Sequence, residues 1–304
     1  MKKLIASVFL VSVVMSLAAC NRTKEPEKSA FAISEIVNRN SEETSTTASS
    51  ESSSTETTAS YKNVSECVKD VVEKTTMMVP AGDEDNEEPE ECVYHYPQLL
   101  IKSSYADEVN KEIASAVEKY MKDVKKTEDA DEVFISTEYI AYLTKEGILS
   151  MVFISDAYYE YCRYKIYNID TKTGEKVDNA RIAQAAGVSS IRKAAMDALQ
   201  AFYNKLGEYK IKDYKVVVKK GKKKNAEMKA VEKTFSEKYL NDNMQIGVTA
   251  DGKIFFVTIV ETSGGAGEYD CLFDAKGCFI NDEDNPYWVG ERSPEDEEGE
   301  GEEE

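Results

Sequence analysis

Histidine is almost absent from this chain, since His95 is the one histidine among 304 residues. Serine and cysteine nucleophiles normally take a histidine as their base, and zinc sites draw on histidine and cysteine. No two cysteines have the spacing of metal ligands. We interpret His95, two residues before Pro97 in a β-like run, as a packed or edge residue. The sequence therefore predicts no catalytic residue, no metal and no cofactor.

A basic excess is also lacking. Lysine and arginine number 38 against 57 acidic residues, which gives a formal net charge of −19. Nucleic acids and anionic lipids are bound through basic patches, so we expect no nucleic-acid partner. The acids gather in residues 83–91 and 295–304. Such runs steer cationic partners towards a protein, although solubility alone also explains them.

Long hydrophobic runs are missing except at residues 4–18, which follow Lys2 and Lys3. That layout is typical of a secretory signal and is too short for a membrane span. Two alanines precede Cys20, a pattern that resembles a bacterial lipoprotein signal. The resemblance implies a diacylglyceryl group on Cys20, removal of residues 1–19 and a membrane-anchored protein on the extracytoplasmic side. An ordinary cleaved signal with a chance cysteine is the alternative.

Large apolar side chains are absent from residues 41–60, where serine and threonine fill 14 of 20 positions. Such a segment cannot bury a core, so we interpret residues 20–60 as a disordered tether. Residues 61–290 are long enough for one α+β domain, or for two closely packed subdomains with a boundary near 170. Residues 291–304 are predicted to be an acidic disordered tail.

Period-two and helical patterns alternate along the folded part. Residues 68–79 favour a strand, although Val64, Val68, Val71 and Val72 also fit a helix. Strands grouped before and after helices indicate an α+β fold with a mostly antiparallel sheet and packed helices. The predicted strands are 68–79, 92–97, 133–144, 148–155, 158–169, 244–249, 253–260 and a pair within 269–280, and the predicted helices begin at 103–104, 180 and 189.

Five cysteines remain after Cys20, and export would permit disulfides. A turn at 274–275 would place Cys271 opposite Cys278 across a hairpin, and Cys67 and Cys92 bracket the first acidic loop. These are the two candidate pairs, but sequence alone leaves the connectivity open, and a reducing host would leave all five as thiols.

The most aromatic strand provides the candidate ligand site. With a period of two, Tyr159, Tyr161, Arg163 and Tyr167 share one face of residues 158–167. Tyrosine interleaved with cationic side chains is enriched in recognition surfaces and can stack on sugars or proteins. The alternative is a sheet face covered by a helix.

Three motifs follow one another in the folded part: "YHYPQL" (94–99), "ADEVNKEIASAV" (106–117) and "NIDTKTGEKV" (168–177). With "DGKIFFVTIVETSGGAGEYDCLF" (251–273), this order resembles an extracellular domain of lysozyme-binding RsiV-type anti-sigma factors. The same domain forms the non-catalytic part of PdaC-type peptidoglycan deacetylases. The anti-sigma factors need a membrane span and the deacetylases a two-histidine metal site, which this sequence lacks. The resemblance therefore implies a fold and a tendency to bind protein or glycan.

These observations favour a lipid-anchored binding module, not an enzyme. Its expected ligand is a cationic extracellular protein, lysozyme-like by family analogy alone, or cell-wall peptidoglycan. Two alternatives remain open. One is a cell-wall hydrolase that uses paired carboxylates, since the chain has 57 acids. The other is an accessory or structural envelope lipoprotein that docks another protein.

Overall fold

The computed structural model describes residues 61–80, 87–125, 133–157, 162–264, 267–275, 277 and 285–290. The predicted signal, tether and acidic tail, with Cys20, lie outside these ranges. The described residues form an α+β fold of mostly antiparallel sheets, as the sequence predicts. None of the helices in this part of the chain is long and apolar enough to cross a membrane.

The larger sheet has the strand order β1-β2-β3-β4-β5, and neighbouring strands are antiparallel except for β2 and β3. β2 meets β3 at one residue pair, Tyr94 with Thr137, and diverges from it beyond that point. β11 pairs with β3 through Trp288 and Val289. The strands are β1 (Val68–Pro80), β2 (Glu87–Leu99), β3 (Phe134–Leu143), β4 (Ile148–Ala157), β5 (Cys162–Asp170) and β11 (Trp288–Val289).

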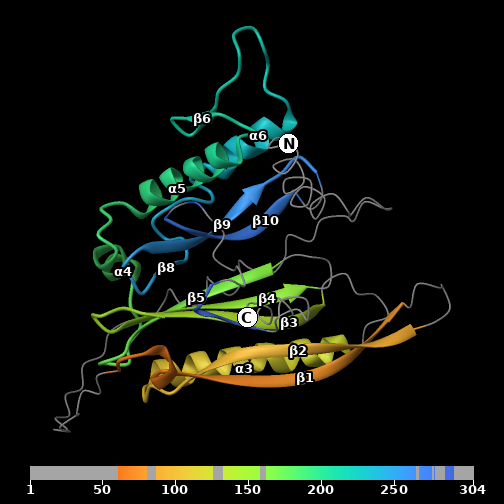
Figure 1. Cartoon of the computed structure of the whole chain (residues 1–304), viewed down its shortest axis with the longest axis vertical. Helices are drawn as coiled ribbons and strands as arrows, with labels where there is room; N and C mark the ends of the chain where they lie inside the picture. Colours follow the sequence, from red (N-terminus) through yellow and green to blue (C-terminus); the bar gives the residue numbers. More distant parts are fainter. Residues whose placement is uncertain are drawn as a thin grey trace, which may run out of the picture.

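Helix α3 (Ser104–Val124) covers one face of this sheet, and Figure 1 shows it behind β1 and β2. The Ser103 side chain caps the helix by accepting a hydrogen bond from the Ala106 amide at 3.0 Å. Val109, Ile113 and Val117 recur at three- and four-residue intervals and are each 1% exposed. This apolar stripe packs on the sheet and forms the first core with it.

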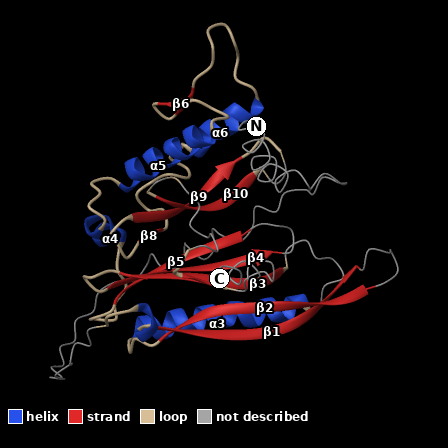
Figure 2. Cartoon of the chain, viewed as in Figure 1, coloured by secondary structure: helices blue, strands red, loops and turns tan. Residues whose placement is uncertain are grey.

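The second half of the chain forms a smaller sheet covered by helices. The strand order is β10-β9-β8, and a short pair, β6 with β7, lies apart from it. Figure 2 shows α5 and α6 above the small sheet and the large sheet below it, with α3 behind β1 and β2 at the bottom. The elements are α4 (Asn179–Ala185), α5 (Ile191–Leu206), β6 (Ile211–Lys212), β7 (Lys215–Val216), α6 (Ala226–Thr234), β8 (Ile246–Val248), β9 (Ile254–Glu261) and β10 (Glu268–Asp274).

The two sheets meet through a third apolar cluster. Ile140, Val152 and Ile154 of the large sheet pack with Phe255 and Leu272 of the small sheet, and all five are buried. The chain passes from the first half to the second after residue 170, where the two-subdomain interpretation places its boundary. Because the sheets share buried side chains, the two halves pack as layers.

Most predicted elements are confirmed, including the strand interpretation of residues 68–79 and the hairpin of β8 and β9. Five elements were not predicted: the short 3-10 helix η1 (Val64–Glu66), β6, β7, α6 and β11. β10 confirms the first strand predicted within 269–280 and pairs with β9, whereas residues 278–280, in which its expected partner falls, lie outside the described ranges. Residues 158–161 of the aromatic strand also lie outside them.

Candidate binding surface on the first hairpin

The predicted aromatic face does not form an exposed site where the structure describes it. Tyr159 and Tyr161 lie outside the described residues. Tyr167 is 5% exposed and belongs to the core beneath α3, and burial raises the pKa of its hydroxyl. The prediction that Tyr167 binds ligand is therefore wrong, because α3 covers the face of β5 to which it belongs.

The cations of the same strand are already engaged. Arg163 donates from Nη1 to Oδ2 of Asp270 at 3.0 Å, which links β5 to β10. Lys165 pairs with Glu112 of α3, and its Nζ lies 5.4 Å from the centre of the Tyr167 ring. Arg163 keeps a half-exposed side chain, but these contacts serve the packing of β5 against its neighbours.

The structure also corrects the first candidate disulfide. Cys67 and Cys92 are buried free thiols, and burial raises the pKa of each to about 11. The strand register places Cys92 opposite Thr75, eight residues along β1 from Cys67. At about 3.3 Å per residue the two sulfurs are far beyond bonding distance. Of the second pair, Cys271 is a buried thiol and Cys278 lies outside the described residues.

A polar cluster lies where β4 and β5 begin to separate. The Cys162 thiol donates to Oδ1 of Asp156 at 2.5 Å, and the Ser136 hydroxyl donates to Oδ2 at 3.4 Å. Burial raises the pKa of Asp156 in spite of these hydrogen bonds. A raised carboxyl pKa is what a general acid needs, but both oxygens already have partners, so the cluster joins strands.

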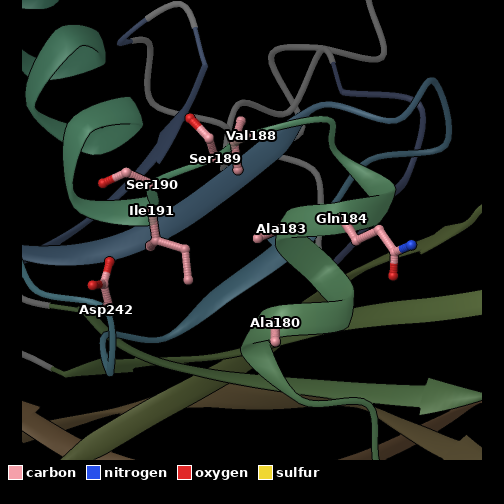
Figure 3. A pocket seen from close by; sticks show the side chains of 8 residues that line it. All are labelled: Ala180, Ala183, Gln184, Val188, Ser189, Ser190, Ile191 and Asp242. Atoms are coloured by element: carbon pink, nitrogen blue, oxygen red, sulfur yellow. The ribbon is translucent and has the colours of Figure 1, made fainter.

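An open hollow of about 370 Å³ lies between α4 and the start of α5 (Figure 3). Its polar groups are few, and Asp242 already accepts from the Arg192 amide at 3.4 Å at the start of α5. The Asp242 carboxylate thus already occupies the N-terminus of α5, where an anion would otherwise be attracted. The lining residues are Ala180, Ala183, Gln184, Val188, Ser189, Ser190, Ile191 and Asp242.

The hairpin of β1 and β2 offers a different surface, the outer edge of the large sheet. β1 ends the strand order, and Figure 1 shows it at the bottom of the molecule with β2 beside it. Among the described residues, no strand pairs with its outer edge. The opposite edge is covered, because Gln245 accepts from the Ile166 amide of β5 at 2.9 Å and Lys176 bridges to Ile169.

The ladder of the hairpin fixes which backbone groups of β1 point outward. The Leu100 amide donates to the Cys67 carbonyl at 2.7 Å, and hydrogen-bonded pairs alternate from there along an antiparallel ladder. Asp70, Val72 and Thr76 belong to the intervening pairs. Their N–H and C=O groups therefore point away from β2, and we call this row the open edge of β1.

Prolines protect β2 but not β1. Pro97 lies opposite Asp70 and Pro89 opposite Met78, both at positions whose N–H would point away from β1. Proline at such positions costs no bond of the β1–β2 ladder and limits pairing on the other edge of β2, where β3 pairs at Tyr94 alone. In β1 the first proline is Pro80, its last residue, so the open edge has no such protection.

Apolar side chains are exposed along the same strand. Val72 is 46% exposed and Met78 is 52% exposed, two of the few large apolar side chains at the surface of the described residues. They share one face of β1, since they are six residues apart. Pro89 and Pro97 are an even number of residues apart, so the sequence indicated that both prolines face the same side of their strand. Which side that is, and that β1 forms the edge of the sheet, becomes clear only once the strand pairing is known.

Polar pairs across the hairpin hold the two strands in register. His95 Nδ1 lies 3.0 Å from Oδ2 of Asp70, and the Tyr96 hydroxyl donates to Glu73 at 2.7 Å. Each joins residues offset by two positions, as the twist of a two-stranded ribbon favours. Burial and the neighbouring Glu73 carboxylate raise the pKa of Tyr96 to about 12. The interpretation of His95 as a packed histidine fits its 18% side-chain exposure.

The hairpin is acidic. Within 68–78 and 89–99 the sequence has four carboxylates, Asp70, Glu73, Glu90 and Glu91, and two lysines. One lysine, Lys74, is paired with Glu91 at 2.7 Å. The connecting residues 81–88 add five acids and no base to the sequence. The open edge of β1 therefore combines unpaired backbone groups, exposed apolar side chains and negative charge.

No protein-family model and no curated protein matches this chain. The resemblance to the RsiV- and PdaC-type domain accordingly stays a prediction, and the functional argument rests on the residues themselves. Among the described residues, no three histidine, cysteine, aspartate or glutamate side chains gather closely enough to hold a metal ion.

Proposed function

We propose that this chain is a lipid-anchored binding module that captures a cationic extracellular protein at the cell surface and catalyses no reaction itself. The observation that carries the proposal is the open edge of β1. There the exposed Val72 and Met78 lie on a strand whose hairpin is rich in carboxylates. Apolar contact supplies affinity, and the negative field of a chain of net charge −19 accelerates encounter.

The tether and the anchor fit this task. If residues 21–60 form the disordered coil that their composition predicts, the coil would span roughly 35 Å on average and hold the folded part away from the bilayer without fixing its orientation. A diacylglyceryl group on Cys20 would keep the protein at the membrane, because two acyl chains bind stably. A module on such a tether samples the volume next to the membrane for its partner.

Titration of the full chain in detergent with lysozyme, a small cationic protein, tests the proposal. Lysozyme whose lysines are acetylated is the matched control, since it keeps its fold and loses positive charge. We expect saturable binding of lysozyme that weakens at least tenfold between 50 and 300 mM salt, and much weaker binding of the acetylated form.

Two outcomes would overturn the proposal. Binding that is equal for native and acetylated lysozyme would show that charge plays no part, and the absence of binding would remove the cationic partner. Turnover of peptidoglycan by the full chain would instead support the hydrolase alternative. Binding of wall fragments without binding of lysozyme would make the ligand a glycan.

A further inference from the structure

The geometry points to strand addition as the mode of recognition: an extended, basic segment of the partner pairs with the open edge of β1 and extends the large sheet. This inference rests on the proposed function and names how its surface works. In strand addition, main-chain hydrogen bonds supply affinity, and alternate side chains supply specificity.

The backbone of β1 is suited to such pairing. The strand has 13 residues, and the N–H and C=O groups of Asp70, Val72 and Thr76 point outward from the sheet. An edge with no proline before its last residue, Pro80, is what natural proteins usually avoid, because it attracts other strands. Its presence beside a β2 that carries Pro89 and Pro97 indicates a use for the β1 edge.

The side chains of β1 define the pattern that a partner must carry. On one face an added strand would lie beside the exposed Val72 and Met78, which favours apolar side chains there. On the other face it would lie beside Glu73, which favours lysine or arginine. A segment that alternates basic and apolar residues meets both demands.

Two occupants from this chain itself fit poorly. A second copy would bring another net charge of −19 to an already acidic hairpin, so repulsion opposes pairing of β1 with β1. Residues 41–60 of the tether carry four glutamates, no basic residue and no large apolar side chain. Neither β1 of a second copy nor residues 41–60 carries the alternation of basic and apolar residues that the edge requires.

A peptide of five Lys–Val repeats with blocked termini tests the inference on the isotope-labelled full chain in detergent. Two readouts are combined: the affinity of the peptide and the hydrogen-exchange rates of single amides. We expect exchange at Val72 and Thr76 to slow at least tenfold when the peptide is bound. The amides of Val71 and Glu73 serve as internal controls, since they already bond to β2.

Methylation of four consecutive central amides of the peptide is the decisive control. It keeps the charge and the side chains of the peptide but removes N–H donors from both edges of the added strand, so that neither edge can donate to β1. We expect the affinity of the methylated peptide to fall at least tenfold. On the protein, Val72→Pro should also weaken binding at least tenfold because it removes one outward N–H. Val72→Ala keeps that N–H and loses only side-chain contact, so it should weaken binding clearly less than Val72→Pro. If Val72→Pro does not fold, the methylated peptide decides.

Failure of this inference can be told apart from failure of the proposed function. If the methylated peptide binds as tightly as its parent, or the Val72 and Thr76 amides stay unprotected in the complex, strand addition is wrong and capture by charge remains. If neither the peptide nor lysozyme binds, both proposals fall. Protection of the same amides without any peptide, at rising protein concentration, would show that a second copy occupies the edge.

Discussion

The hydroxyl of Ser150 donates a 2.6 Å hydrogen bond to Oδ1 of Asn168 between β4 and β5, out of contact with solvent. Asn168 also bonds to the small sheet, because its Nδ2 donates to the Ile246 carbonyl at 2.8 Å. The Val248 amide in turn donates to the Ser150 oxygen at 3.1 Å. These two side chains therefore tie β8 of the small sheet to the large sheet.

We expect Asn168→Ala to lower the free energy of unfolding by about 2 to 3 kcal/mol, because it leaves the Ile246 carbonyl without its side-chain donor and the buried Ser150 hydroxyl without its acceptor. Denaturant unfolding of Asn168→Ala, Ser150→Ala and the double variant measures the effect and its coupling. Since the two side chains bond each other, the double variant should cost at least about 1 kcal/mol less than the sum of the single variants. Additive effects would show that the connection contributes nothing.

The burial of Asp156 leads us to expect that the stability of the fold depends on pH. Burial holds the pKa of its carboxyl above the ordinary value, so the folded protein binds this proton more tightly than the unfolded chain. The stability that Asp156 contributes is present below its unfolded pKa, near 4, and falls as the pH rises through the folded pKa. Asp156→Asn should therefore be more stable than the wild type at pH 7, by a margin that shrinks towards pH 4.

Asp170 is the matched control because its shift has the opposite sign. Burial raises its pKa, but the Arg181 guanidinium and the amides of Lys172 and Thr173 outweigh burial and hold the pKa below its ordinary value. Its stabilisation is present above the unfolded pKa and lost as the pH falls. Asp170→Asn should thus be less stable than the wild type at pH 7. Thermal unfolding from pH 3 to 8 that shows one sign for both variants would contradict this account.

Gly174 and Gly187 make a second matched pair. Both have positive φ, 73° and 67°, so a side chain at either costs about 1 kcal/mol of backbone strain. A Cβ on Gly174 would also lie 2.4 Å from Cβ of Ser103, the cap of α3. A Cβ on Gly187 would have no atom of a non-neighbouring residue within 4 Å. Chemical unfolding should show Gly174→Ala to be the more destabilising variant, and equal losses would mean that the contact with Ser103 relaxes freely.

Anchoring is predicted to depend on the sulfur of Cys20. The diacylglyceryl group would be attached there, and two acyl chains are what hold such a protein to a bilayer. Cell fractionation should find the wild type with the membranes and Cys20→Ala in the soluble fraction. Mass spectrometry of the wild type supplies the second reading, and a chain without lipid on residue 20 would remove the lipoprotein assignment.

Local patterns predicted the fold where side-chain period and capping agreed. Ser103 and the stripe of Val109, Ile113 and Val117 specified α3, and apolar or alternating β-like runs separated by turn residues specified β3 to β5. The residues around 68 to 72 fit both a strand and a helix, because valines at those spacings satisfy both periods; pairing with β2 decided between them. Trp288 and Val289 form a two-residue strand that is too short to have a period.

The candidate site was harder to predict for a related reason. Period two correctly placed Tyr167 and Lys165 on one face of β5, but it does not tell which face a helix covers, and α3 covers this one. The predicted disulfide between Cys67 and Cys92 was wrong because two cysteines that flank the same loop in the sequence need not lie opposite each other in the paired strands. The open edge of β1 depends on the order of strands in the sheet, which is a long-range property.

One measurement tests the central claim most directly: the association rate of lysozyme with the full chain after neutralising three carboxylates of the hairpin, Glu73→Gln, Glu90→Gln and Glu91→Gln together. The control neutralises three exposed acids in loops away from the hairpin, Glu146→Gln, Glu175→Gln and Glu237→Gln, and so removes the same total charge. Capture at the open edge of β1 predicts that the hairpin variant associates at least about tenfold more slowly than the wild type and the control less than about threefold. Equal rates for the two variants would contradict a binding site on this hairpin.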